Sequence, residues 1–82
     1  MTHMTARQAT TAARRALLGV GIKHAMVRSV RDAVVDPTGA VRVAATTNVF
    51  GIDLTPEVRA ALESIDGVSE VRDWESFIGV TF

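Results

Sequence analysis

The arginines of the N-terminal region are the side chains whose type and spacing most readily suggest binding. Arg7, Arg14 and Arg15 fall near one side of a predicted helix, and Lys23 follows its end. Such a group can contact phosphate or an acidic protein surface, although a solvated helix face is its commoner role. The chain as a whole carries no net charge, and no aromatic residue lies among these cations to stack on bases. These features favour a protein contact over nucleic acid.

Carboxylates concentrate in the second half of the chain, and one aromatic residue lies among them. Asp73 and Glu75 flank Trp74, the single tryptophan. An acid–base pair would need two carboxyl groups held across a cleft, which a chain of 82 residues rarely builds. Exposed tryptophan is enriched at protein interfaces; the alternative is that Trp74 folds over the edge of the core. The candidate partner-binding residues are therefore Arg7, Arg14, Arg15 and Trp74.

Several kinds of chemistry lack the residues that they need. The chain has no cysteine, which excludes disulfides, thiolate metal sites and a cysteine nucleophile. His3 and His24 are far apart, no serine lies in a Gly-x-Ser-x-Gly context, and Gly19-Val20-Gly21 lacks the Gly-Lys ending of a phosphate loop. We therefore predict no catalytic, cofactor-binding or metal-binding residue and no enzymatic activity. A cysteine-free chain also fits a cytoplasmic location.

The charges are sorted along the chain, and this is its most informative feature. Residues 1–35 carry six basic side chains and one acidic one, whereas residues 36–82 carry three basic and eight acidic ones, so the two halves have net charges of +5 and −5. Such asymmetry can steer an acidic partner or join two copies. We predict a non-enzymatic protein–protein interaction or assembly module. The alternative is a nucleic-acid-associated protein that uses the arginines of the first helix.

The size and composition of the chain favour self-association. Alanine, which brings little apolar area, makes up a large share of the apolar residues, so a core in a chain this short is only marginally stable. A homodimer would add buried surface. No apolar run approaches the roughly 20 residues that span a bilayer, so we expect no membrane partner.

The first half of the chain predicts a helix followed by a hairpin. Thr5 and Gln8 form a capping box for a helix over 5–19. Residues 36–39, Asp-Pro-Thr-Gly, have the composition of a type I turn, which joins strands at about 25–35 and 40–47. Two registers are open, one pairing Val34 with Val41 and the other Ala33 with Val43. We favour the second, because the first places Asp32 unpaired on the valine face.

The second half predicts a helix and two strands. Thr55 caps a helix with Pro56 at its first position. Its apolar stripe is Val58, Ala61, Leu62 and Ile65, and Gly67 ends it. A strand over 68–72, a turn over 73–76 and a strand over 77–82 follow, and Phe50 is expected to fill the end of the sheet beneath the helix.

These elements together predict one small α+β domain over residues 1–82, with 1–4 as a disordered lead. The expected architecture is a two-layer sandwich, with two helices on one face of a three- to four-stranded antiparallel sheet. The order is α-β-β-α-β-β, or α-β-β-α-β if the last two strands form one bent strand.

The C-terminal third shows a local resemblance to known families. Residues 58–71, from the helix through Gly67-Val68, followed by Phe77-Ile78-Gly79-Val80-Thr81, resemble the ending of the N-terminal domain of NifU-like iron–sulfur scaffold proteins. They are also similar to the last helix and strand of many ferredoxin-like domains, including heavy-metal-associated ones. The metal-binding and cluster-binding cysteines of those families are missing here, so the resemblance implies local topology and no function.

Overall fold

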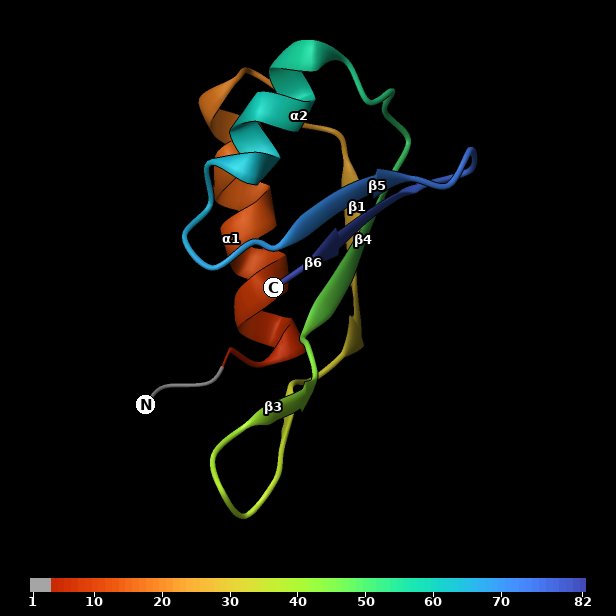
Figure 1. Cartoon of the computed structure of the whole chain (residues 1–82). Coiled ribbons are helices and arrows are strands. Elements are labelled where there is room, and N and C mark those ends of the chain that lie inside the picture. Colours follow the sequence, from red (N-terminus) through yellow and green to blue (C-terminus); the bar gives the residue numbers. More distant parts are fainter. Residues whose placement is uncertain (1–3) are drawn as a thin grey trace.

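A computed structural model describes residues 4–82, so His3 and most of the expected disordered lead lie outside the described residues. Within them, helices and strands alternate in the predicted order (Figure 1). The elements are α1 (Ala6–Gly19), β1 (Met26–Arg31), β2 (Val34–Val35), β3 (Val41–Val43), β4 (Thr46–Phe50), α2 (Pro56–Glu63), β5 (Glu70–Asp73) and β6 (Ile78–Thr81). The predicted α+β class is confirmed.

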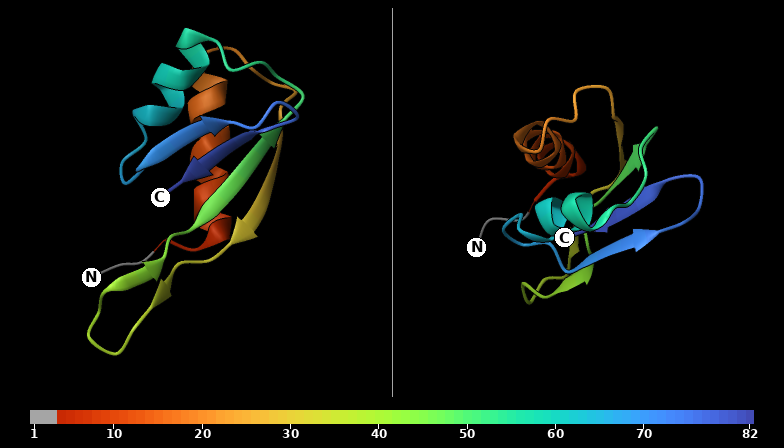
Figure 2. Two further views of the ribbon diagram at one scale, coloured as in Figure 1. Left: turned by 45° about the vertical axis from the view of Figure 1, so that its right-hand side comes forward. Right: turned by 90° about the horizontal axis from the view of Figure 1, so that it is seen from above.

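The main sheet is antiparallel and has the strand order β1-β4-β6-β5. Helix α1 packs on β1 and β4, whereas α2 packs on β5 and on α1. Both helices cover the same face of the sheet, as predicted, and the other face carries no helix (Figure 2). Strands β2 and β3 form a separate two-stranded ribbon that projects beyond the helices.

Helix α1 begins where the capping box places it. The Thr5 hydroxyl accepts a hydrogen bond from the Gln8 N–H at 3.1 Å, and the Gln8 side chain accepts one from the Thr5 N–H at 2.9 Å. A long-range contact adds to this cap, because Asp32 Oδ1 accepts a hydrogen bond from the Ala6 N–H at 2.7 Å. A carboxylate at this position also complements the positive end of the helix dipole.

Helix α2 likewise starts from a local signal. The Thr55 hydroxyl accepts a hydrogen bond from the Val58 N–H at 3.2 Å, and Pro56 occupies the first turn. Val58 and Leu62 are buried against the sheet, as the stripe predicts. Arg59 pairs with Glu63 at 3.3 Å and also donates to the carbonyl oxygen of Val71 at 3.0 Å, which ties the helix to β5.

The predicted hairpin register is wrong. Val34 pairs with Val43 and Val35 with Val41, and the register shifts between these pairs. A second irregularity lies between Ser29 and Arg31, so the two expected long strands break into β1 with β2 and β3 with β4. A bulge moves every later pairing by one residue. The reason for our preferred register also fails, because the carboxylate of Asp32 is bonded to the start of α1.

The tip of the ribbon is closed by one carboxylate. Asp36 Oδ1 accepts hydrogen bonds from the Thr38 hydroxyl at 2.6 Å, from the Thr38 N–H at 2.9 Å and from the Ala40 N–H at 3.0 Å. The Thr38 hydroxyl first, and then the Ala40 N–H, hold the pKa of Asp36 below its ordinary value of 3.8. Ionised Asp36 therefore organises this turn.

We expect the tip to titrate below the ordinary aspartate range. Because the folded pKa of Asp36 is lowered, its stabilising contribution is present above the unfolded pKa, near ~3.9, and is lost as the pH falls through the folded value. The amide resonances of Thr38 and Ala40, followed by NMR from pH 6 downward, should shift with a midpoint below that of an aspartate in a peptide. Asp36→Asn should remove the transition, and a midpoint at or above the peptide value would contradict this assignment.

Candidate interaction surfaces

The structure does not bring the four predicted partner-binding residues together. Arg14 lines a groove between α1 and β1, whereas Arg7 and Arg15 border a shallow hollow on another side of α1. Trp74 lies beyond β5, at the opposite edge of the sheet. Two distinct surfaces therefore merit description.

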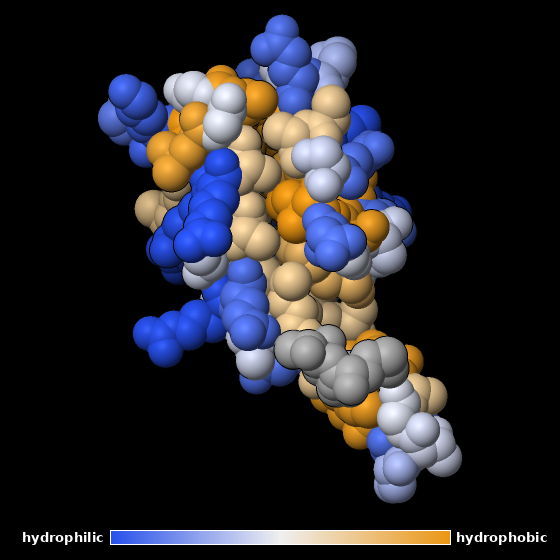
Figure 3. All heavy atoms as spheres, turned by 90° about the vertical axis from the view of Figure 1, so that its left-hand side faces the viewer, coloured by the Kyte–Doolittle hydropathy of each residue, from blue (hydrophilic) through white to orange (hydrophobic). Residues whose placement is uncertain are grey.

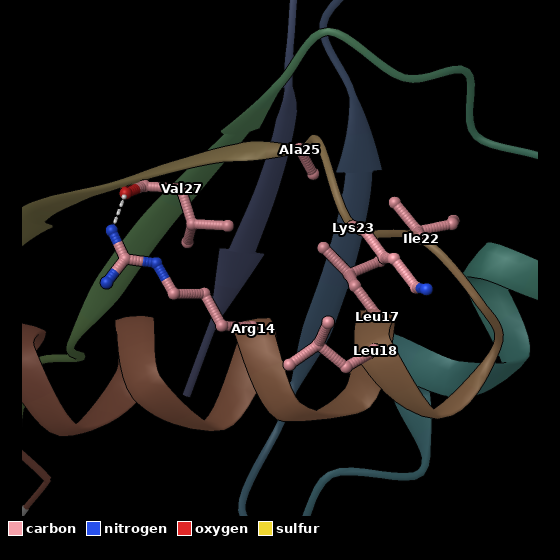
Figure 4. Close-up of a pocket in the computed structure, with 7 residues that line it drawn as sticks. All are labelled: Arg14, Leu17, Leu18, Ile22, Lys23, Ala25 and Val27. Atoms are coloured by element: carbon pink, nitrogen blue, oxygen red, sulfur yellow. Dashed lines mark hydrogen bonds between the residues drawn. The ribbon is translucent and has the colours of Figure 1, made fainter.

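The first surface is a groove between the second half of α1, the loop that follows it and the start of β1. We call it the α1–β1 groove. It has a volume of about 170 Å³, and Figure 4 shows the side chains around it. They are Arg14, Leu17, Leu18, Ile22, Lys23, Ala25 and Val27. Its walls are mostly apolar, and Leu18 is 58% exposed to solvent.

Two cations frame the apolar part of this groove. Arg14 Nη2 donates a hydrogen bond to the carbonyl oxygen of Val27 at 3.1 Å, which holds the guanidinium beside β1. Lys23 lies toward the other end, beside Ile22 (Figure 4). Because β1 has β4 as its one neighbour in the sheet, its outer edge borders the groove without a strand partner. The groove thus offers apolar contact, positive charge and an open strand edge.

The second surface is a group of aromatic rings on the face of the sheet that carries no helix. We call it the aromatic cluster, and it comprises Phe50, Trp74 and Phe77. The centroids of Phe50 and Phe77 are 5.5 Å apart, and those of Trp74 and Phe77 are 6.3 Å apart. The expected place of Phe50 beneath α2 is wrong: Val49 points into the core, so its neighbour on the strand points to the other face.

Trp74 rests on a site that only glycine can provide. A Cβ atom on Gly79 would lie 2.8 Å from Trp74 Nε1, so the indole occupies the space of the missing side chain. The guanidinium carbon of Arg72 lies 4.1 Å from the centroid of the ring, within range of a cation–π interaction. Trp74 nevertheless remains 48% exposed. The indole is held in a fixed place and still presents about half of its surface to solvent.

The turn around Trp74 is acidic and conformationally restricted. Asp73 Oδ1 accepts a hydrogen bond from the Glu75 N–H at 3.0 Å. Glu75 has a φ of 72°, a left-handed conformation that is uncommon for residues other than glycine. The turn projects from the end of the β5–β6 hairpin (Figure 1). It presents one apolar ring between two carboxylates.

Folding places the two charge groups on opposite sides of the molecule. Strands β1 and β5 form the two edges of the sheet. The basic edge, formed by α1, its following loop and β1, carries Arg7, Arg14, Arg15, Lys23, Arg28 and Arg31 and no carboxylate. The acidic edge, formed by α2, β5 and their adjoining loops, carries Asp53, Glu57, Glu63, Asp66, Glu70, Asp73 and Glu75 against Arg59 and Arg72.

Apolar surface also lies outside the two sites. Val34 and Val41 on the ribbon are each about half exposed, and so is Val30 at the end of β1. Figure 3 shows, on the helix side, apolar surface near the upper end of the helices and on the projecting ribbon. Sequence reasoning did not find the α1–β1 groove. Its one local signal is Leu18, a large apolar residue that lies off the buried stripe of its helix.

Fold and surfaces define a small two-layer α+β protein with a charged surface at each edge of its sheet. Comparisons with protein-family models, with curated proteins and with solved structures found no match for this chain. Among residues 4–82, no helix is long and apolar enough to cross a membrane. In the same part of the chain, no three side chains of histidine, aspartate or glutamate are grouped as a metal site requires.

Proposed function

We propose that this protein is an assembly module that associates with copies of itself, with the basic edge of one copy against the acidic edge of the next. One observation carries the proposal: the two edges of the same sheet bear opposite charge. Electrostatic complementarity of this kind speeds encounter and fixes orientation. The groove beside β1 and the exposed tryptophan beyond β5 supply apolar contact at the same two edges.

The geometry favours head-to-tail association over a closed dimer. Because the two charged surfaces lie at opposite edges, one partner copy cannot cover both at once. Each copy would then contact two neighbours through unlike surfaces, which gives rings or open chains. The strand directions fit this arrangement, since β5 runs antiparallel to β1 through the antiparallel ladders that connect them. A neighbouring β5 beside β1 would continue the antiparallel sheet.

The side chains of the two edge strands also favour unlike pairing. Strand β1 carries Arg28 and Arg31 and has no proline, whereas β5 begins with Glu70 and ends with Asp73. Positive charge on an edge strand opposes pairing between two identical edges. The same charge attracts an acidic edge, so repulsion and attraction select the same arrangement.

Charge reversal on one edge at a time tests this proposal. Arg28→Glu with Arg31→Glu removes the basic edge, and Asp66→Lys with Glu70→Lys removes the acidic edge; all four side chains are exposed. In sedimentation velocity at low salt, the unaltered protein should form oligomers that grow with concentration, and each variant should remain monomeric. An equimolar mixture should form a one-to-one dimer and nothing larger, because one intact surface of each kind remains.

Salt and the mixture experiment together decide the outcome. Raising the ionic strength to 1 M should dissociate the oligomers, because the Debye length falls from ~8 Å at physiological strength to ~3 Å. A mixture of variants that stays monomeric would contradict the head-to-tail arrangement. An unaltered protein that is monomeric at high concentration and low salt would refute self-association itself.

Nucleic-acid binding by the first helix has less support. That function needs Arg7, Arg14 and Arg15 on one surface, but the guanidinium of Arg14 is turned toward β1 and bonded to the Val27 carbonyl. The hollow beside Arg7 and Arg15 is lined by Gln8, Thr11 and Ala12, and it holds no aromatic ring. Stacking on bases would have no platform there.

A further inference from the structure

We propose that the exposed half of Trp74 from one copy occupies the α1–β1 groove of the next copy. This inference rests on the proposed head-to-tail association and names the contact that would hold it. Trp74 and the groove lie at the acidic and basic edges respectively. Apolar shape, charge and position along the strands each support the match.

The apolar parts fit one another in kind and in size. The groove has a volume of about 170 Å³, and an apolar cavity of ~150 Å³ accommodates a single benzene ring. Leu18 at the groove is 58% exposed, and Trp74 is 48% exposed. Both are large apolar side chains left in water by the single chain. Burial of a tryptophan in a small apolar pocket is a common energetic centre of protein interfaces.

The charges around the two surfaces are opposite in sign. Arg14 and Lys23 frame the groove, and Asp73 and Glu75 flank Trp74. An indole seated between the two cations would bring two carboxylates to the rim of the groove. Pairs at a rim contribute more to orientation and association rate than to affinity. They would therefore select this tryptophan and this turn over a bare apolar side chain.

The sheet register places both surfaces at the same end of the strands. Met26 at the start of β1 pairs with Phe50, and the adjacent Val49 pairs with Ile78. Ile78 in turn pairs with Asp73 at the end of β5. When a neighbouring β5 lies antiparallel beside β1, its terminal turn is thus level with the groove. No shift along the strands is needed to bring the indole to its place.

The turn is organised before any partner binds. Gly79 and Phe77 support the indole, Arg72 lies over its ring, and the Asp73–Glu75 hydrogen bond fixes the backbone. A side chain that is already ordered loses little conformational entropy on binding. The indole can keep its seat on Gly79 and still be covered on its exposed side.

Intrinsic fluorescence reports this contact directly, because Trp74 is the single tryptophan of the chain. The emission maximum should move to shorter wavelength as the protein is concentrated at low salt, in parallel with oligomer formation measured by sedimentation. It should return to longer wavelength at 1 M salt. A dilution series of the unaltered protein gives both readings on the same samples.

Substitutions on the two sides of the contact should have matching effects. Trp74→Ala and Leu18→Glu should each weaken association by about 10- to 100-fold, the range of an interface centre. Val41→Glu is the matched control, because Val41 is a half-exposed apolar residue on the ribbon and lies away from the groove. Circular dichroism should show that Leu18→Glu and Val41→Glu leave the fold intact.

A charge exchange tests the role of the rim. Lys23→Glu alone and Glu75→Lys alone should each weaken association a few-fold, as exposed ion pairs do. Combining both changes in one chain should restore it, since each contact again joins opposite charges. Glu75→Lys retains the same backbone demand at this position, so a loss of association reports on charge.

The outcomes separate this inference from the proposed function. If the unaltered protein oligomerises and the edge variants complement each other, but Trp74→Ala and Leu18→Glu associate normally without a fluorescence shift, the contact proposed here is wrong and head-to-tail association stands. If no oligomer forms at any concentration at low salt, both fail. A fluorescence shift that accompanies oligomers and disappears in Leu18→Glu supports both.

Discussion

Replacing Leu62 with alanine should lower the free energy of unfolding by about 2–5 kcal/mol. Leu62 lies on α2 with its side chain fully buried, among the largest such side chains of the core. It belongs to the core cluster that joins α1, α2 and the sheet. Its truncation removes apolar burial and leaves a cavity that such a small core cannot easily close. In a domain of this size the loss is a large fraction of the total stability.

The matched control is Leu18→Ala, the same chemical change on the other helix at a largely exposed position. It should change the free energy of unfolding by no more than about 0.5 kcal/mol. Urea denaturation followed by circular dichroism measures both variants. A loss of less than about half a kcal/mol for Leu62→Ala would mean that α2 does not pack on the sheet as described.

Both helices could be predicted because their signals are local. The Thr5–Gln8 capping box and the Thr55-Pro56 start each lie within a few residues of the backbone groups that they satisfy. The buried stripes follow from helical periodicity alone. The α+β class and the shared helix face follow from the order of the elements. These inferences need no knowledge of which residues meet across the fold.

The hairpin and Phe50 were mispredicted because their placement depends on distant contacts. The bulges and the bond from Ala6 to Asp32, which joins residues 26 positions apart, decide the register together. Periodicity within the strand cannot reveal such a partner. Phe50 is an apolar residue on the open face, where it meets Phe77 from another strand. An alternating pattern does not say which apolar residue faces the core.

The candidate surfaces were predicted residue by residue and not as assemblies. Arg14 and Trp74 stood out from their type and their neighbours in the sequence. The groove that Arg14 lines needs the end of α1, the following loop and the start of β1 together. The seat of Trp74 needs Gly79 on the next strand. Charge asymmetry was visible in the sequence, but its division between opposite edges depends on the strand order.

Ala13→Leu should destabilise the fold by about 1–3 kcal/mol, and by more if the backbone cannot adjust. Ala9 and Ala13 are fully buried where α1 lies on β1 and β4. The sequence treats these alanines as a weakness, because they bring little apolar area. The structure gives them a second role: a small side chain lets the helix lie close against the sheet. A leucine at Ala13 would need room that a well-packed interior does not have.

Ala12→Leu is the control for this change, because Ala12 borders a solvent-facing hollow on the same helix. Its extra atoms can extend into water, so stability should change by less than about 0.5 kcal/mol. Thermal and urea unfolding separate the two variants, and equal stability would show that α1 packs more loosely than described. Ala13 also lies beside Arg14 and one turn before Leu17, both of which line the α1–β1 groove. A helix displaced by Ala13→Leu should therefore lose self-association as well, because the groove keeps its width only while the alanines hold α1 close to β1.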